Sequence, residues 1–143
     1  MSRTACAVAA GLLLLAARAP AHHAFASEYD QNKLVTVSGV VTRLEWTNPH
    51  ASMYVEGKDS TGKTGAWRFE MGSPGGLQRR GWKQSDVKAG DAVTVDGFAA
   101  KDGSNLANAR IVTLADGRQL FGGFASTPRE PGPRKPGPPE PGK

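Results

Sequence analysis

The stretch TGAWRFEMGSPGGLQRRGW, residues 64–82, decides the fold class. Its first eight residues alternate, with Trp67 and Phe69 on one side, which is the pattern of a half-buried β-strand. Helix signals follow at once: Ser73 is a candidate N-cap, a proline occupies the first helical position, and Gly81 follows a basic pair. The stretch therefore predicts one strand followed directly by one short helix.

Strand patterns flank this helix on both sides. Two alternating runs precede residues 64–82, at 34–46 and 51–59, and two follow, around residues 92–96 and 107–114. Three strands, one helix and two strands is the element order of an OB-fold. We therefore expect an all-β protein with one short helix, a small five-stranded OB-like Greek-key barrel over residues 33–125. Another small barrel and a β-sandwich are the alternatives.

The first predicted strand contains Gly39 in its middle, which indicates a bulge or a sharp coil in a strand that crosses both sheets of a closing barrel. Apolar residues of the predicted elements are the candidate core, because burial of apolar surface drives folding. These candidates are Leu34, Val37, Val40, Leu44, Val55, Trp67, Phe69, Leu77, Val93, Val95, Ile111 and Val112.

The first 21 residues have the pattern of a secretory signal peptide. Arg3 precedes an apolar run, and Ala19-Pro20-Ala21 has the small residues of a cleavage site. The run is shorter than the roughly 20 apolar residues that span a bilayer, although an uncleaved anchor is the alternative. We expect cleavage after Ala21, a periplasmic or secreted protein without a stable membrane span, and a mature chain that begins with a short N-terminal segment, residues 22–32.

Charge and cysteine content limit the function classes. The chain has a net charge of +5, but residues 22–125 hold twelve Lys and Arg against eleven Asp and Glu, so the predicted domain is nearly neutral. This balance argues against nucleic acid as a partner. The only cysteine, Cys6, lies in the signal peptide, so the mature chain has neither disulfide nor thiolate metal ligand. Residues 126–143 are rich in Pro and Gly and predict a disordered tail.

The three histidines are the strongest candidate site. After cleavage, His22 would offer both a free α-amine and an imidazole, which together can chelate one metal ion. His50, at the turn before the second strand, would supply a second imidazole, and His23 is a substitute ligand. Nitrogen ligands in a tetragonal arrangement favour copper, although another divalent metal is possible. The alternative is that the paired histidines belong to a frayed end and that His50 is only a turn residue.

A second candidate site is aromatic. OB-folds bind ligands with stacking side chains on the face formed by strands two and three. Tyr54 and Trp67 lie in those strands and Trp46 ends the first strand, so a small ligand or a periplasmic protein partner could bind there. The alternative is that the tryptophans only fill the core and its rim.

The sequence contains no constellation that indicates an enzyme. It has no nucleophile elbow, no phosphate-binding loop and, after cleavage, no thiol. The strand carboxylates Glu45, Glu56 and Glu70 are expected to face solvent. We therefore expect a binding protein without catalytic activity.

Several segments together resemble a known family. HHAF, EWTNPH, GSP followed by RRGW, and AKDGS are similar to motifs of a family of small exported bacterial proteins known only as a domain of unknown function. The resemblance covers roughly residues 22–121. It implies a signal peptide and a small barrel, and it implies no activity. The proline-rich tail is not part of the shared pattern.

Overall fold

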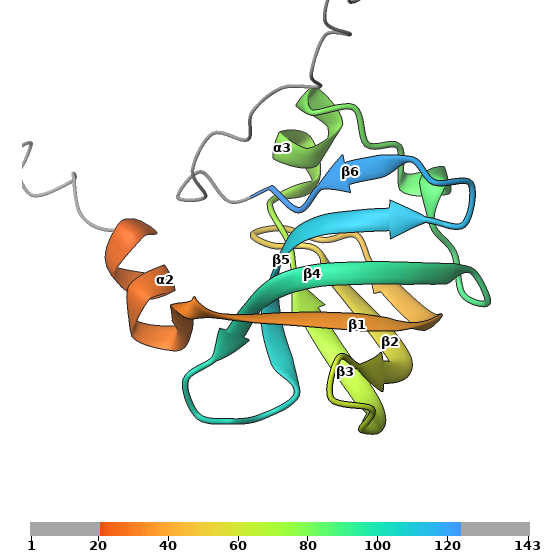
Figure 1. The fold of residues 1–143 in the computed structure, drawn as a ribbon. Coiled ribbons are helices and arrows are strands. Elements are labelled where there is room, and N and C mark those ends of the chain that lie inside the picture. Colours follow the sequence, from red (N-terminus) through yellow and green to blue (C-terminus); the bar gives the residue numbers. More distant parts are fainter. Residues whose placement is uncertain (1–20, 124–143) are drawn as a thin grey trace, which may run out of the picture.

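Six strands form one antiparallel sheet that closes on itself (Figure 1). The computed structural model describes residues 21–123, with side chains from Phe25 onward. Its elements are α2 (Ala21–Glu28), β1 (Tyr29–Glu45), β2 (Ser52–Asp59), β3 (Thr64–Glu70), α3 (Pro74–Arg79), the 3-10 turn η1 (Gln84–Asp86), β4 (Ala92–Ala100), β5 (Leu106–Leu114) and β6 (Gln119–Phe121). The expected all-β class with little helix is confirmed.

The strand order explains how the sheet closes. Neighbours run β3-β2-β1-β4-β5-β6, and all of these pairs are antiparallel. A short parallel pairing between β3 and β5 joins the two ends of the five-stranded set, so β1 to β5 form a ring. A closed ring leaves few unpaired strand edges. The strand β6 is added at the outer side of β5, beyond the five strands expected from the sequence.

The helix signals between β3 and β4 are confirmed in detail. The Ser73 side chain accepts a hydrogen bond from the backbone nitrogen of Gly76, and Pro74 opens α3. The helix stops where Gly81 takes a positive φ of 98°. Leu77 is the buried residue of α3 and joins the barrel core, so this helix covers one end of the ring (Figure 1).

The long strand β1 forms antiparallel pairs with β2 along one edge and with β4 along the other, so it connects the two parts of the ring. The bulge expected at Gly39 is not there: the register with β2 is continuous at Gly39 and shifts between Val41 and Arg43. Gly39 instead faces Gly57 of β2, where an added Cβ would lie 2.2 Å from the Glu56 carbonyl oxygen. The glycine therefore allows a close backbone approach between two strands.

The core contains most of the expected residues. Val37, Phe69 and Leu77 are fully buried, as are Met53 and Met71. Two expectations were wrong, because Leu34 is 58% exposed and Val40 is 46% exposed. Side chains of a strand alternate between its faces, and Val37 points inward, so residues at odd separations from it point outward.

The helix α2 was not expected. Its Phe25 packs 5.4 Å from the ring of Tyr29 and 5.9 Å from that of Phe98, measured between ring centroids. These residues and Ala100 form a second apolar cluster on the outside of the barrel. The sequence alone did not indicate this helix because its apolar partner lies on β4, far away in the chain.

Some sequence expectations fall on residues outside the described range. The predicted signal peptide before Ala21 and the predicted tail 126–143 belong to them. In the part of the chain that the structure describes, no helix has the length and apolar character needed to cross a bilayer.

Candidate metal site at His50 and Glu70

The backbone brings His50 to the end of β3. His50 follows a cis peptide bond between Asn48 and Pro49 and directly precedes Ala51. The Ala51 nitrogen donates to the Gly72 carbonyl at 3.0 Å, and the Ala51 carbonyl accepts from the Met71 nitrogen at 2.9 Å. These two bonds hold the start of the second strand against the residues that follow Glu70.

Glu70 lies on the outer face of the barrel because its neighbours Phe69 and Met71 fill the core. Its oxygen Oε1 is 2.7 Å from Nδ1 of His50, and its oxygen Oε2 accepts a 2.7 Å hydrogen bond from the hydroxyl of Tyr29. The Glu70 side chain is only 14% exposed, whereas that of His50 is 45% exposed. The carboxylate is thus a largely buried bridge between a tyrosine and an accessible imidazole.

Tyr29 is held in its protonated form. Burial raises the pKa of its hydroxyl well above the usual range, and the hydrogen bond to the Glu70 carboxylate raises it further. The hydroxyl therefore remains a donor at physiological pH. Since Glu70 faces Nδ1 of His50, a neutral His50 ring carries its proton on Nδ1. The lone pair of the neutral ring is then on Nε2, the nitrogen on its other side.

The residues around Glu70 form a polar row across the outer face. Ser52 of β2 pairs with Glu70 of β3, and Glu70 pairs in turn with Asn108 of β5. On its other side, Asn108 pairs with Phe98 of β4. The Arg68 side chain donates to the Ser52 hydroxyl at 3.3 Å. Asn108 is fully buried, and neither its Nδ2 nor its Oδ1 has a hydrogen-bond partner among the described residues.

The predicted metal ligands are only partly placed. The backbone of His22 and His23 belongs to α2, which leads directly into Tyr29 and hence to Glu70. Their side chains lie outside the described range. Among the side chains that are described, no three His, Cys, Asp or Glu residues are grouped as metal ligands.

A scan against protein-family models gives one match, a family of unknown function, DUF6152, over residues 9–109. The chain belongs to this family. No curated protein and no solved structure matches it. The part matched to DUF6152 contains every residue of the candidate site, from the N-terminal histidines to Asn108.

The expected aromatic surface is not assembled in this DUF6152 protein. Tyr54 is opposite Arg68 in register, whereas Trp67 is opposite Val55, so Tyr54 and Trp67 lie on opposite faces of the sheet. The guanidinium of Arg43 lies 4.0 Å from the Tyr54 ring centroid on the outside. Trp67 points inward and stacks on Phe69 at 6.1 Å.

The third residue of that prediction, Trp46, is also separate from the other two. It packs against the core, 6.1 Å from the ring of Trp82, whose indole nitrogen donates to the Phe121 carbonyl at 2.9 Å. These contacts place Trp46 near the segment that follows α3. The structure therefore brings none of the three aromatic residues together into one surface.

Sequence reasoning missed Glu70, Tyr29 and Asn108. Glu70 was expected in solvent, yet it is the residue that orients His50. A usable signal existed, because the start of one strand lies beside the end of the next in a β-hairpin, which places His50 near Glu70. No local signal exists for Tyr29, whose hydroxyl reaches a residue 41 positions away.

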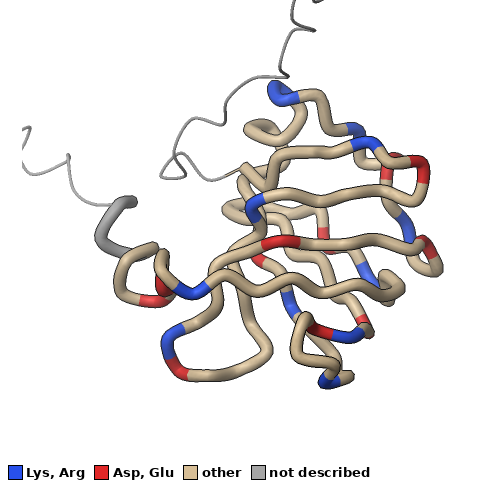
Figure 2. The backbone as a smooth tube through the Cα atoms, viewed as in Figure 1, with Lys and Arg blue, Asp and Glu red and all other residues tan. Residues whose placement is uncertain are grey.

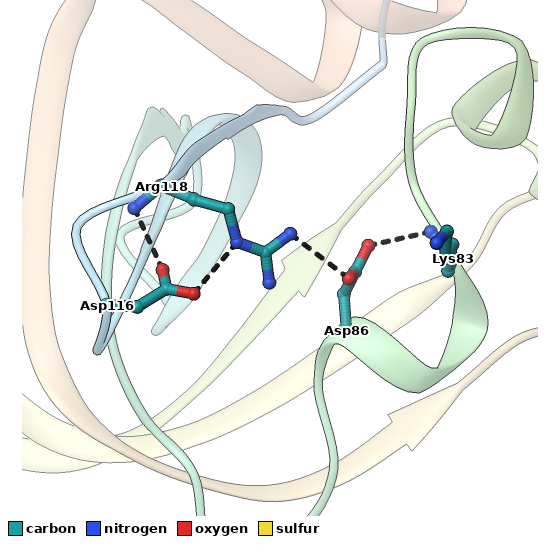
Figure 3. A network of polar contacts seen from close by, with 4 residues as sticks. All are labelled: Lys83, Asp86, Asp116 and Arg118. Carbon is teal, nitrogen blue, oxygen red and sulfur yellow. Dashed lines mark hydrogen bonds and ion pairs between the residues drawn. The ribbon is translucent and has the colours of Figure 1, made fainter.

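A second polar network in this DUF6152 domain is structural. Arg118 contacts Asp116 at 2.8 Å and Asp86 at 3.3 Å, while Asp86 accepts a 2.7 Å bond from the Lys83 backbone nitrogen (Figure 3). Hydrogen bonds to the two carboxylates raise the pKa of Arg118, and the bond from Arg118 lowers that of Asp116. The network ties η1 to the turn between β5 and β6.

Proposed function

We propose that the protein is an exported, OB-like Greek-key binding protein that holds copper or another divalent metal through His50 and the mature N-terminal His22. The observation that carries the proposal is the 2.7 Å contact between His50 Nδ1 and the Glu70 carboxylate. Metal-binding histidines usually direct one ring nitrogen to a carboxylate or carbonyl and bind the metal with the other. The ring of five strands, with α3 between β3 and β4, supports the finer fold assignment.

The N-terminal helix supports the involvement of His22. Helix α2 is tethered to the barrel by the Tyr29–Glu70 bond and by Lys101, whose Nζ donates to the Ala26 carbonyl and whose nitrogen donates to the Glu28 carbonyl. Cleavage after Ala21 would start the mature chain within this helix, at His22. The new α-amine has an ordinary pKa near 8, so it loses its proton at little cost near neutral pH.

Copper suits the proposed donors. An amine and two imidazoles are nitrogen ligands, and Cu(II) prefers such ligands in a tetragonal arrangement. His23 is the substitute for the second ligand, through its own imidazole and the amide between the two histidines. We propose that the protein acts by binding, without catalysis, in the periplasm or outside the cell.

The test compares two chains that both begin at His22, one with a free α-amine and one whose α-amine is acetylated. We expect the first to bind Cu(II) with a dissociation constant of about 1 μM or tighter by isothermal titration, and the second to bind at least tenfold more weakly. The reason is that acetylation removes the amine donor and with it the chelate ring to the His22 imidazole. Electron paramagnetic resonance should show one nitrogen ligand fewer in the acetylated chain.

Side-chain variants complete the test. His50→Ala should weaken Cu(II) binding at least tenfold, and Glu70→Gln should weaken it by about 10–100-fold because the imidazole loses its orienting carboxylate. Glu45→Gln is the matched control, a strand carboxylate that hydrogen-bonds Tyr54 and forms an ion pair with Arg43. Circular dichroism checks that each variant folds. Unchanged binding in folded His50→Ala would contradict the proposal.

A further inference from the structure

A cavity of about 280 Å³ opens at the end of the barrel opposite α3. Its walls come from the start of β1, the β2–β3 turn and the β4–β5 loop, which lie at the lower end of the molecule in Figure 1. Mouths of β-barrels are common ligand sites, and the volume is just below the roughly 300–1,000 Å³ of typical small-molecule pockets. None of the residues of the His50 site lines this cavity.

The inner wall of the cavity is apolar and includes an indole. Val35, Trp67, Ala99 and Ala100 line it, and the 58% exposed Leu34 extends the apolar surface to the rim. Within the described residues the indole nitrogen of Trp67 makes no hydrogen bond to the protein, in contrast to that of Trp82. A buried apolar wall with an exposed leucine beside it suits an aliphatic or aromatic ligand body.

The polar groups at the rim are mostly engaged with one another. Oδ1 of Asp59 accepts hydrogen bonds from the Thr61 nitrogen and hydroxyl and from the Lys63 nitrogen. These bonds, with that of the Thr61 hydroxyl foremost, lower the pKa of Asp59 and keep it ionised. The Asn105 side chain donates to the Ala66 carbonyl. The rim therefore offers few hydroxyl or amide partners for a sugar.

Two lysine ammonium groups are the remaining charges. Lys33 and Lys63 both line the cavity, and the positive charge of Lys63 contributes to the lowered pKa of Asp59. Against the single Asp59 carboxylate, the mouth keeps one excess positive charge. Lys and Arg on one hand and Asp and Glu on the other are spread over the whole barrel (Figure 2), so the excess at the mouth is local.

We propose that the barrel mouth binds a small monoanionic amphiphile, such as a medium-chain carboxylate. The apolar chain would lie along Leu34 and Trp67, and the carboxylate would lie between Lys33 and Lys63. One excess positive charge matches one anionic head group, and the volume matches a short chain. This site is separate from the metal site and does not depend on it.

The experiment uses the mature chain and three matched probes below their aggregation concentrations: octanoate, octan-1-ol and octylamine. We expect octanoate to bind most tightly and octylamine most weakly by isothermal titration, equally with and without a chelator. In ¹H–¹⁵N spectra, assigned with Trp67→Phe, octanoate should shift the Trp67 indole signal and leave that of Trp82 in place. A response that disappears with the chelator would overturn the separation from the metal site.

Variants distinguish the charge from the apolar wall. Lys33→Gln with Lys63→Gln should weaken octanoate binding about three- to tenfold, the range for exposed ion pairs, and leave octan-1-ol binding unchanged. Lys83→Gln with Lys88→Gln is the matched control outside the cavity. Leu34→Ser, at an exposed position that leaves the core intact, should weaken both probes. Equal binding of octanoate and octan-1-ol, equal losses in the two lysine pairs, or no binding at millimolar octanoate would overturn the proposal.

Discussion

Substitution Tyr29→Phe removes one hydroxyl and tests whether the outer-face site is energetically coupled to the fold. The hydroxyl donates a 2.7 Å hydrogen bond to the Glu70 carboxylate, in a place where that side chain is only 14% exposed. A hydrogen bond to a charged group contributes about 1.5–3 kcal/mol. The phenyl ring keeps its contacts with Phe25 and Phe98, so the loss is that of the bond alone.

We expect the free energy of unfolding to fall by about 2 kcal/mol. This value lies in the lower part of the range for hydrogen bonds to charged groups, because Glu70 keeps its contact with His50. For a domain of this size, that loss lowers Tm by roughly 8–16 °C. Urea unfolding followed by tryptophan fluorescence gives the free energy, and calorimetry gives Tm. A double-mutant cycle with Glu70→Gln isolates the pairwise contribution.

The chain supplies a matched control in Tyr54→Phe. Tyr54 also donates from a strand to a carboxylate, but the bond to Glu45 is 3.1 Å long and the Glu45 side chain is 38% exposed. We expect this control to cost only about 0.5 kcal/mol. The reasoning is refuted if Tyr29→Phe costs no more than Tyr54→Phe, or if the double-mutant cycle gives no coupling between Tyr29 and Glu70.

Three further predictions concern stability. Gly39→Ala places a Cβ against the Glu56 carbonyl oxygen and should lower the free energy of unfolding, measured in urea, by about 3 kcal/mol or more. Gly75→Ala is the control and should be tolerated, because its Cβ meets nothing closer than 3.5 Å. Equal effects of the two variants would contradict the close approach of β1 and β2. Asn108→Leu removes a buried amide that has no partner within residues 21–123 and should leave the free energy of unfolding unchanged or raise it by about 1–2 kcal/mol. A clear loss of stability would contradict this and show that the amide is bonded in solution. Stability should also decrease as pH falls below about 4, because carboxyl groups with lowered folded-state pKa values stabilise the fold when ionised and lose that contribution on protonation. These groups are Asp59, Asp91, Asp102 and Asp116. An acid titration followed by circular dichroism at several urea concentrations measures this slope, and a flat profile from pH 6 to 3 would contradict it.

The sequence predicted the strands and α3 because their signals are local. Alternation with period two marks β2 and β3, and Ser73, Pro74 and Gly81 mark the ends of α3 whatever the rest of the chain does. It failed at β1, where Leu34 and Val40 were assigned to the core. There both faces carry apolar residues, so only pairing with β2 and β4 determines which face is buried.

The sequence by itself determined the order of β1 to β5 with α3 among them, the near-neutral charge of residues 22–125 and His50 as a candidate ligand. Tertiary structure alone decided that Tyr29 joins Glu70 beside that histidine. Glu70 comes from the end of β3 and Tyr29 from the start of β1, and they meet because the ring of strands closes. The same closure buried Asn108, whereas the register of β2 with β3 separated Tyr54 from Trp67. Contacts between distant elements depend on strand register, and register is a property of the assembled sheet that no local pattern contains.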